Sequence, residues 1–137
     1  MQPATFVRNL ALAGVIAVGA IATQGLHAEE KAKTTALLKT ALSGVEGKEV
    51  NLKHMKKPAG WVSPKHYHPG HVFVYILEGT MVVEVEGQET RTVGPGEVFH
   101  ELPKRVMQAK NASATDWVKF VIFQVGDEGT SLTVKVK

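Results

Sequence analysis

The sequence predicts an all-β, single-domain fold of the jelly-roll kind, a small sandwich or barrel. Short apolar or alternating runs recur along the chain, and glycine-containing turns separate them. No segment after Ser43 carries a convincing helical periodicity of about 3.6 residues. The length of 137 residues fits one domain, which excludes a multidomain enzyme.

Residues 1–28 have the pattern of a secretory signal peptide. Their apolar run, residues 10–22, has 13 residues (22 − 10 + 1), whereas a membrane-spanning helix needs about 20. We therefore expect export to a periplasmic or secreted location and no stable membrane anchor. Cleavage after Ala22 and cleavage after Ala28 both fit, and Ala28 is preferred because it leaves a polar spacer. The remaining domain is residues 29–137.

The amino-acid composition excludes several kinds of partner and reactive group. The net charge is +3 and the 16 Lys and Arg residues are spread along the chain, so we expect no nucleic-acid partner. The chain has no Cys, which excludes disulfides, zinc ribbons, iron–sulfur clusters and a thiol nucleophile. Any chemistry must use the six His residues, the carboxylates or Met.

The first expected element is residues 34–42, where a strand and a helical turn both fit and the strand is preferred. Residues 49–52 alternate, and Pro58 to Gly60 then breaks the chain. Residues 72–77 form a β-branched and aromatic run that ends at Gly79.

The later elements are short strands separated by turns. In residues 80–86, Met81, Val83 and Val85 share one face, as in a half-buried strand. Turns are expected at residues 87–88 and 94–96. The remaining strands are expected at residues 97–101, at residues 117–125 with apolar side chains on both faces, and at residues 132–136.

Three of the His residues, His66, His68 and His71, lie within residues 64–71. On a strand, His66 and His68 point to the same face about 6–7 Å apart at Cα, so both imidazoles can converge on one metal ion. Two ligands do not complete a site, because transition metals usually take three or four protein ligands. A pair of solvent-exposed or hydrogen-bonded His residues is the alternative interpretation.

The segment resembles the first motif of the cupin superfamily, G-x5-H-x-H-x3-E-x6-G. Gly60, His66, His68 and Gly79 stand at the matching positions, whereas Val72 stands at the acidic position. Valine has no lone pair to donate, so a metal ion would need other donors or waters.

The second cupin motif, G-x5-P-x-G-x2-H-x3-N, is matched at its ends by Gly96 and Asn111. Leu102, Lys104 and Met107 stand where Pro, Gly and His are expected.

The resemblance covers about residues 34–137 and implies a six-to-eight-stranded cupin barrel. It also implies a metal site of three His and one Glu for manganese, iron, nickel, copper or zinc, of which this chain keeps two ligands. Small cupins tend to pair through their outer strands, so we expect a homodimer, which would also support a modest core.

Further candidate ligands are Met107 and His71. Met107 carries a soft thioether that would favour copper, although a buried Met is more often a packing residue. Strict alternation places His71 on the face opposite position 72, and a bulge at Gly70 would turn it inward. His100 is expected at the surface or the rim. Aromatic or acidic side chains that could line a pocket are Trp61, Tyr67, Tyr75 and Glu101.

The sequence therefore predicts an exported small cupin that binds a divalent transition metal ion through His66 and His68, with Met107 or His71 as a third ligand. It would act on or sense a small molecule, and whether it is an enzyme, such as an oxygenase or isomerase, stays open. One alternative is a metal-free ligand-binding or assembly module. Another is a periplasmic copper-binding protein that uses His66, His68 and Met107.

Overall fold

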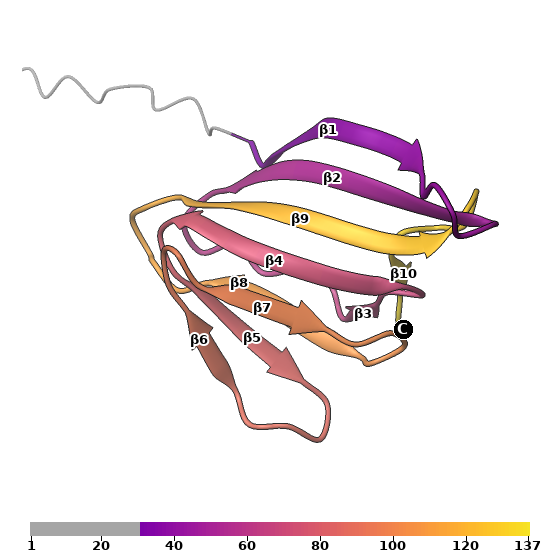
Figure 1. The fold of residues 1–137 in the computed structure, drawn as a ribbon. Helices are drawn as coiled ribbons and strands as arrows, with labels where there is room; N and C mark the ends of the chain where they lie inside the picture. The colour runs from indigo at the N-terminus through magenta and orange to yellow at the C-terminus, as the bar shows by residue number, and fades with distance from the viewer. Residues whose placement is uncertain (1–30) are drawn as a thin grey trace, which may run out of the picture.

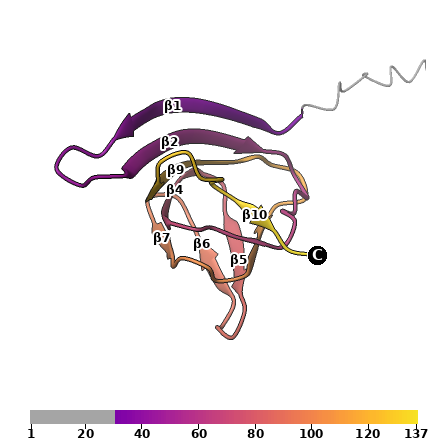
Figure 2. The same ribbon diagram turned by 90° about the vertical axis from the view of Figure 1, so that its right-hand side faces the viewer.

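The computed structural model describes residues 31–137, so the expected signal peptide and its cleavage sites lie outside the described residues. The described part is all-β, with ten strands and no helix, and two antiparallel five-stranded sheets pack against each other (Figures 1 and 2). No helix within residues 31–137 is long and apolar enough to cross a membrane. The predicted all-β fold is confirmed.

The first sheet has the order β1-β2-β9-β4-β7. Its strands are β1 (Lys33–Ala41), β2 (Lys48–Lys57), β9 (Val118–Asp127), β4 (His71–Glu78) and β7 (Val98–Glu101). The second sheet has the order β10-β3-β8-β5-β6. Its strands are β10 (Val134–Lys135), β3 (His66–Tyr67), β8 (Met107–Asn111), β5 (Met81–Val85) and β6 (Arg91–Val93).

The segment that the sequence left open between strand and helical turn is strand β1. It pairs with β2 at the edge of the first sheet, and all nine of its residues are exposed. The expected strand at residues 132–136 is shorter than predicted, since β10 contains only Val134 and Lys135. Its pairing partner β3 is equally short, which limits the ladder to two residue pairs.

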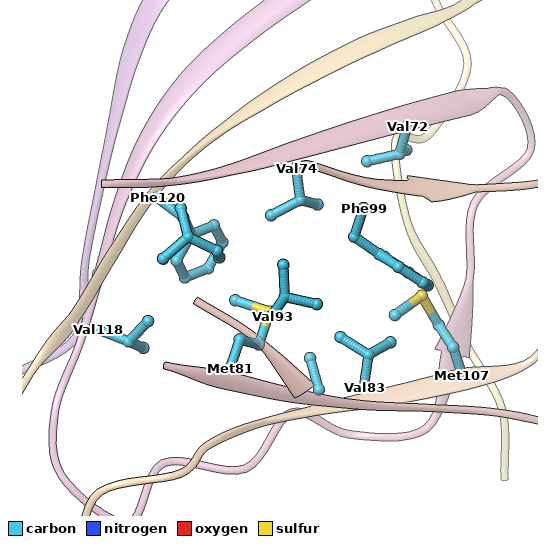
Figure 3. Packing of buried hydrophobic residues seen from close by; sticks show 11 residues of the cluster. Val72, Val74, Met81, Val83, Val93, Phe99, Met107, Val118 and Phe120 are labelled. Carbon is cyan, nitrogen blue, oxygen red and sulfur yellow. The ribbon is translucent and has the colours of Figure 1, made fainter. Parts of the chain in front are cut away.

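The core lies between the two sheets and follows the alternation of the strands. In β4, Val72, Val74 and Ile76 are buried while the residues between them are exposed. In β5, Met81 and Val83 are buried, as the alternation predicts. Figure 3 shows the side chains of both sheets meeting in this layer. The cluster comprises Val72, Val74, Ile76, Met81, Val83, Val93, Phe99, Met107, Ala109, Val118 and Phe120.

Strand β9 is apolar on both faces, as expected from residues 117–125. Val118 and Phe120 are buried in the core, whereas Phe123 is exposed on the outer face. Strand β9 lies between β2 and β4 and is paired along most of its length to both. The first sheet therefore covers the core with one face and presents a partly apolar outer face.

Candidate functional site

A cavity of about 190 Å³ opens between the two sheets next to the core. Side chains from both sheets line it, including Met55 of β2, His66 of β3, Glu101 of β7 and Met107 of β8. His68, in the loop between β3 and β4, also lines it. The structure therefore brings together His66, His68 and Met107, three of the four predicted ligands.

His66 and His68 each form a hydrogen bond from Nδ1 to a backbone carbonyl oxygen. Nδ1 of His66 lies 2.8 Å from the carbonyl oxygen of Pro64, and Nδ1 of His68 lies 2.6 Å from that of Leu132. A carbonyl oxygen only accepts hydrogen bonds, so both Nδ1 atoms donate and carry the proton. In the neutral form each Nε2 then has a free lone pair, which is the usual arrangement of metal-binding imidazoles. The ring centroids are 4.9 Å apart.

Glu101 is the acidic side chain of the site. Its carboxylate is buried, and Oε2 lies 3.0 Å from Nε2 of His68. Despite this approach, Oε2 accepts no hydrogen bond of regular geometry within residues 31–137. A buried carboxylate oxygen without a donor is costly, so this position calls for a proton or a cation.

Glu101 lies beside Val72 in the first sheet. The two residues are directly paired across β4 and β7, so both point into the barrel. The first cupin motif expects its acid at position 72, and here the acid comes from the neighbouring strand. From the sequence, Glu101 was only one of several candidate pocket-lining residues. The alternation of β7, with Phe99 and Glu101 buried and His100 exposed, was the signal that could have singled it out.

The pKa of His68 reflects both its burial and its acidic neighbour. Desolvation by burial is the largest single effect and lowers this pKa, but the attraction of the Glu101 carboxylate, 3.0 Å from Nε2, and the Leu132 carbonyl together outweigh it. The net direction is a raised pKa. The Glu101 carboxylate and the Leu132 carbonyl therefore favour the protonated form of His68 more than burial disfavours it.

Met107 lies in the core and in the cavity wall. It is buried, it pairs with His66 across β3 and β8, and its side chain points inward toward Phe99 in Figure 3. This position suits the packing role and also leaves the thioether beside the imidazoles.

His71 is not brought to the cavity. It lies on the outer face of β4, where strict alternation places it, and its Nδ1 is 3.0 Å from Nε2 of His100. His100 is exposed, in agreement with the expected surface position. Among the predicted pocket-lining residues, Trp61 and Glu101 line the cavity, whereas Tyr75 is exposed on the outer face and Tyr67 is not in the cavity wall.

The nitrogen and oxygen atoms that face the cavity are of the kinds that bind transition metal ions. No group of three or more His, Cys, Asp or Glu side chains in the described part of the chain is close enough to hold one. Nε2 of His68 and Oε2 of Glu101 lie 3.0 Å apart, which is also the distance of an ordinary N–H···O hydrogen bond. His66, His68 and Glu101 line the same cavity, so these are the residues that would hold a metal ion there.

Comparison with known proteins identifies the family. The cupin domain profile matches residues 53–123, a little over half of the chain. The chain belongs to the cupin family. A search of curated proteins found no match to this cupin.

Solved structures share the fold. An RmlC-like cupin family protein from Methanocaldococcus jannaschii, with a double-stranded β-helix fold, is 22% identical with a TM-score of 0.60, covering 74% of this chain and 85% of that one. A cupin-like protein from Thermotoga maritima is 16% identical with a TM-score of 0.62, covering 77% and 75%. DMSP lyase DddQ from Ruegeria pomeroyi is 21% identical with a TM-score of 0.61, covering 83% of this chain and 56% of that one. At these identities the similarity establishes the fold alone.

Proposed function

We propose that this cupin is an exported protein that binds a divalent transition metal ion through His66, His68 and Glu101 and holds a small molecule in the same cavity. The observation that carries the proposal is the buried Glu101 carboxylate, whose Oε2 faces Nε2 of His68 at 3.0 Å without a regular hydrogen bond. His71, which the sequence offered as a further ligand, has no part in it because it lies on the outer face.

The hydrogen bonds of His68 explain why a cation belongs there. With Nδ1–H donated to Leu132, a neutral imidazole turns its Nε2 lone pair toward the carboxylate, and two lone pairs repel each other. His68 and Glu101 would together hold a cation, and its positive charge would offset this repulsion. Gln124 donates to the same carbonyl oxygen at 2.8 Å, which further fixes the carbonyl that orients the ring.

The cavity walls position the other groups. The Pro64 carbonyl holds His66 with Nε2 free, and Met107 offers a thioether from the paired strand. When bound, a divalent metal ion supplies Lewis acidity toward an oxygen of the bound molecule. The chain's own residues would orient that molecule and exclude water from it.

Metal content is the direct test. Protein purified without an affinity tag or chelator should contain near-stoichiometric metal by inductively coupled plasma mass spectrometry. The double variant His66→Ala/His68→Ala should contain none, and Glu101→Gln should bind the same ion about tenfold or more weakly. His71→Ala removes an imidazole from the outer face and serves as the matched control, with unchanged metal content. Metal-free wild type, or equal metal in the double variant, would refute the site.

A metal-free ligand-binding barrel is the second candidate. Apolar side chains dominate the cavity wall, and the raised pKa of His68 allows an imidazolium–carboxylate pair to replace the metal ion. This candidate is supported if the purified protein contains no metal and binds none in titration.

Whether the Met107 thioether is a ligand bears on which metal ion the site would prefer. A thioether is a soft ligand that favours copper, whereas nitrogen and oxygen ligands alone also suit manganese, iron, nickel or zinc. If the protein handles copper, Met107→Leu should lower copper affinity about tenfold or more and leave zinc affinity unchanged. Equal copper affinity in both proteins would exclude a thioether ligand.

Export rests on the sequence pattern of residues 1–28. Mass spectrometry of the protein recovered from the periplasm or the medium should find a chain that begins at Glu29, or at Thr23 if cleavage follows Ala22. An intact amino terminus in the cytoplasm would contradict export.

A second copy of the chain is the proposed protein partner, supported by the outer face of the first sheet. One row of side chains crosses all five strands there in register: Leu38, Leu52, Phe123, Phe73 and His100. Tyr75 and Val98 pair beside this row and are 44% and 55% exposed. A contiguous apolar patch of this kind marks an interaction surface.

A further inference from the structure

We propose that the molecule held in the cavity is a small organic carboxylate with an apolar body, whose carboxylate pairs with Lys57 and Lys135. The inference deepens the proposed function, since it names the ligand class of the same cavity. It rests on the charge, the apolar lining and the size of that cavity.

The charged groups of the cavity wall favour an anion. Lys57 and Lys135 both line it, and the wall contains one acidic side chain, the buried Glu101. That carboxylate already faces His68. Neither lysine has a carboxylate within salt-bridge distance among residues 31–137. The wall therefore carries an excess of positive charge that its own acid does not neutralise, and a bound metal ion would increase it.

The two lysines reach the cavity from different elements. Lys57 ends β2, and its Nζ lies 5.4 Å from the ring centroid of Trp61, another wall residue. Lys135 of β10 pairs directly with His66 of β3. Burial lowers the pKa of Lys57, so its ammonium is incompletely solvated and gains from a bound anion. Lys135 is exposed, which places it on the solvent side of the same wall.

The rest of the wall favours an apolar body. Its hydrophobic side chains include Met55, Trp61, Val74, Met81, Phe120 and Ile122. The Ser63 hydroxyl is already used, because it donates to the Pro64 carbonyl and accepts from the Ala109 amide. A sugar or another polyol would leave hydroxyl groups without partners against this wall, at a cost in binding free energy. An aliphatic or aromatic group would bury its surface favourably.

The volume of the cavity also limits the size of the ligand that it can hold. A cavity of about 190 Å³ suits a compact ligand better than a nucleotide or a large cofactor. Benzoate and hexanoate are suitable probes because each joins one carboxylate to a compact apolar body.

The experiment is a calorimetric titration of benzoate into the purified full-length protein, with benzamide as the neutral probe of similar shape. It is done on chelator-treated protein and on protein loaded with the metal found in it. Lys57→Met and Lys135→Met each remove one ammonium while keeping an apolar stem. Lys56→Met removes the same charge from the adjacent residue, which stacks on Trp117 at 4.2 Å outside the cavity.

Benzoate should bind at least tenfold more tightly than benzamide, and each cavity variant should weaken benzoate binding about tenfold, with wild-type affinity in Lys56→Met. Affinity should fall as salt is raised. Binding to chelator-treated protein with this lysine dependence supports the inference even if no metal site exists, so the two proposals fail separately. Equal affinity for both probes, no benzoate binding in either form, or metal-dependent binding that ignores both lysines would overturn it.

Discussion

Lys104 stands where the second cupin motif has glycine, and its backbone keeps a conformation that favours glycine. Its φ of +61° is the one positive value among the non-glycine residues of the described chain. Its amide donates to the carbonyl of His68 at 2.8 Å, so this turn is attached to the candidate site. The conformation persists because the surrounding contacts hold it, and a side chain in this region costs about 1–2 kcal/mol.

Lys104→Gly should therefore stabilise the protein by about 0.5–1 kcal/mol, the strain relieved minus the greater flexibility of glycine in the unfolded chain. Urea denaturation measures the change. Arg105→Gly is the matched control, because Arg105 has no positive φ and should lose about 1 kcal/mol. Equal destabilisation by both substitutions would show that Lys104 is not strained.

The His68–Glu101 pair predicts a pH dependence of stability in the metal-free protein. Because the folded pKa of His68 is raised above the unfolded value of about 6.5, the stabilisation is fully present below pH 6.5 and is lost as pH rises through the folded pKa. In the presence of a chelator, the free energy of unfolding of wild type relative to Glu101→Gln should decrease as the pH rises above about 6.5. A difference that grows with pH would contradict the pairing.

At the scale of elements, the turn after β4 depends on Gly79. Its φ is +75°, and a Cβ there would lie 2.5 Å from the carbonyl oxygen of Trp117, the residue before β9. The requirement is therefore both conformational and steric. Gly96 has a similar φ of +82°, but a Cβ there would meet nothing within 4 Å.

Alanine substitutions at Gly79 and Gly96 distinguish the cost of the left-handed backbone from the cost of the steric clash. Gly96→Ala should cost about 1 kcal/mol from the left-handed backbone alone, whereas Gly79→Ala should cost about 3 kcal/mol or more because backbone atoms must also move. Denaturant midpoints of the two variants give the comparison. Equal losses would mean that the Trp117 backbone yields easily.

At the scale of the whole molecule, the exposed row on the first sheet predicts a homodimer. Light scattering after size exclusion should give about twice the mass of one chain. Phe73→Asp places a charge within the row, beside Phe123, and should produce a monomer with an unchanged β-sheet circular dichroism spectrum. Val136→Asp is the control, because Val136 is 39% exposed but lies outside this sheet. A monomeric wild type would exclude the dimer.

Local patterns were sufficient for the fold class and for most of the core. Alternation in residues 72–77 and 80–86 predicted the buried faces of β4 and β5, since the period of a strand is set by its own backbone. The spacing of Gly60, His66, His68 and Gly79 indicated the cupin barrel, which the family match confirmed. Alternation also placed His71 on the outer face.

The acid of the candidate site depended on strand pairing, which local sequence does not contain. Val72 and Glu101 are 29 positions apart (101 − 72), and only the β4–β7 register brings them side by side. The ties from His68 to Leu132 and from β3 to β10 are also long-range contacts. A motif records which residues lie near one another along the chain, whereas a cavity is formed by residues that the sheets bring together, so its donors and its charge were decided by the tertiary structure.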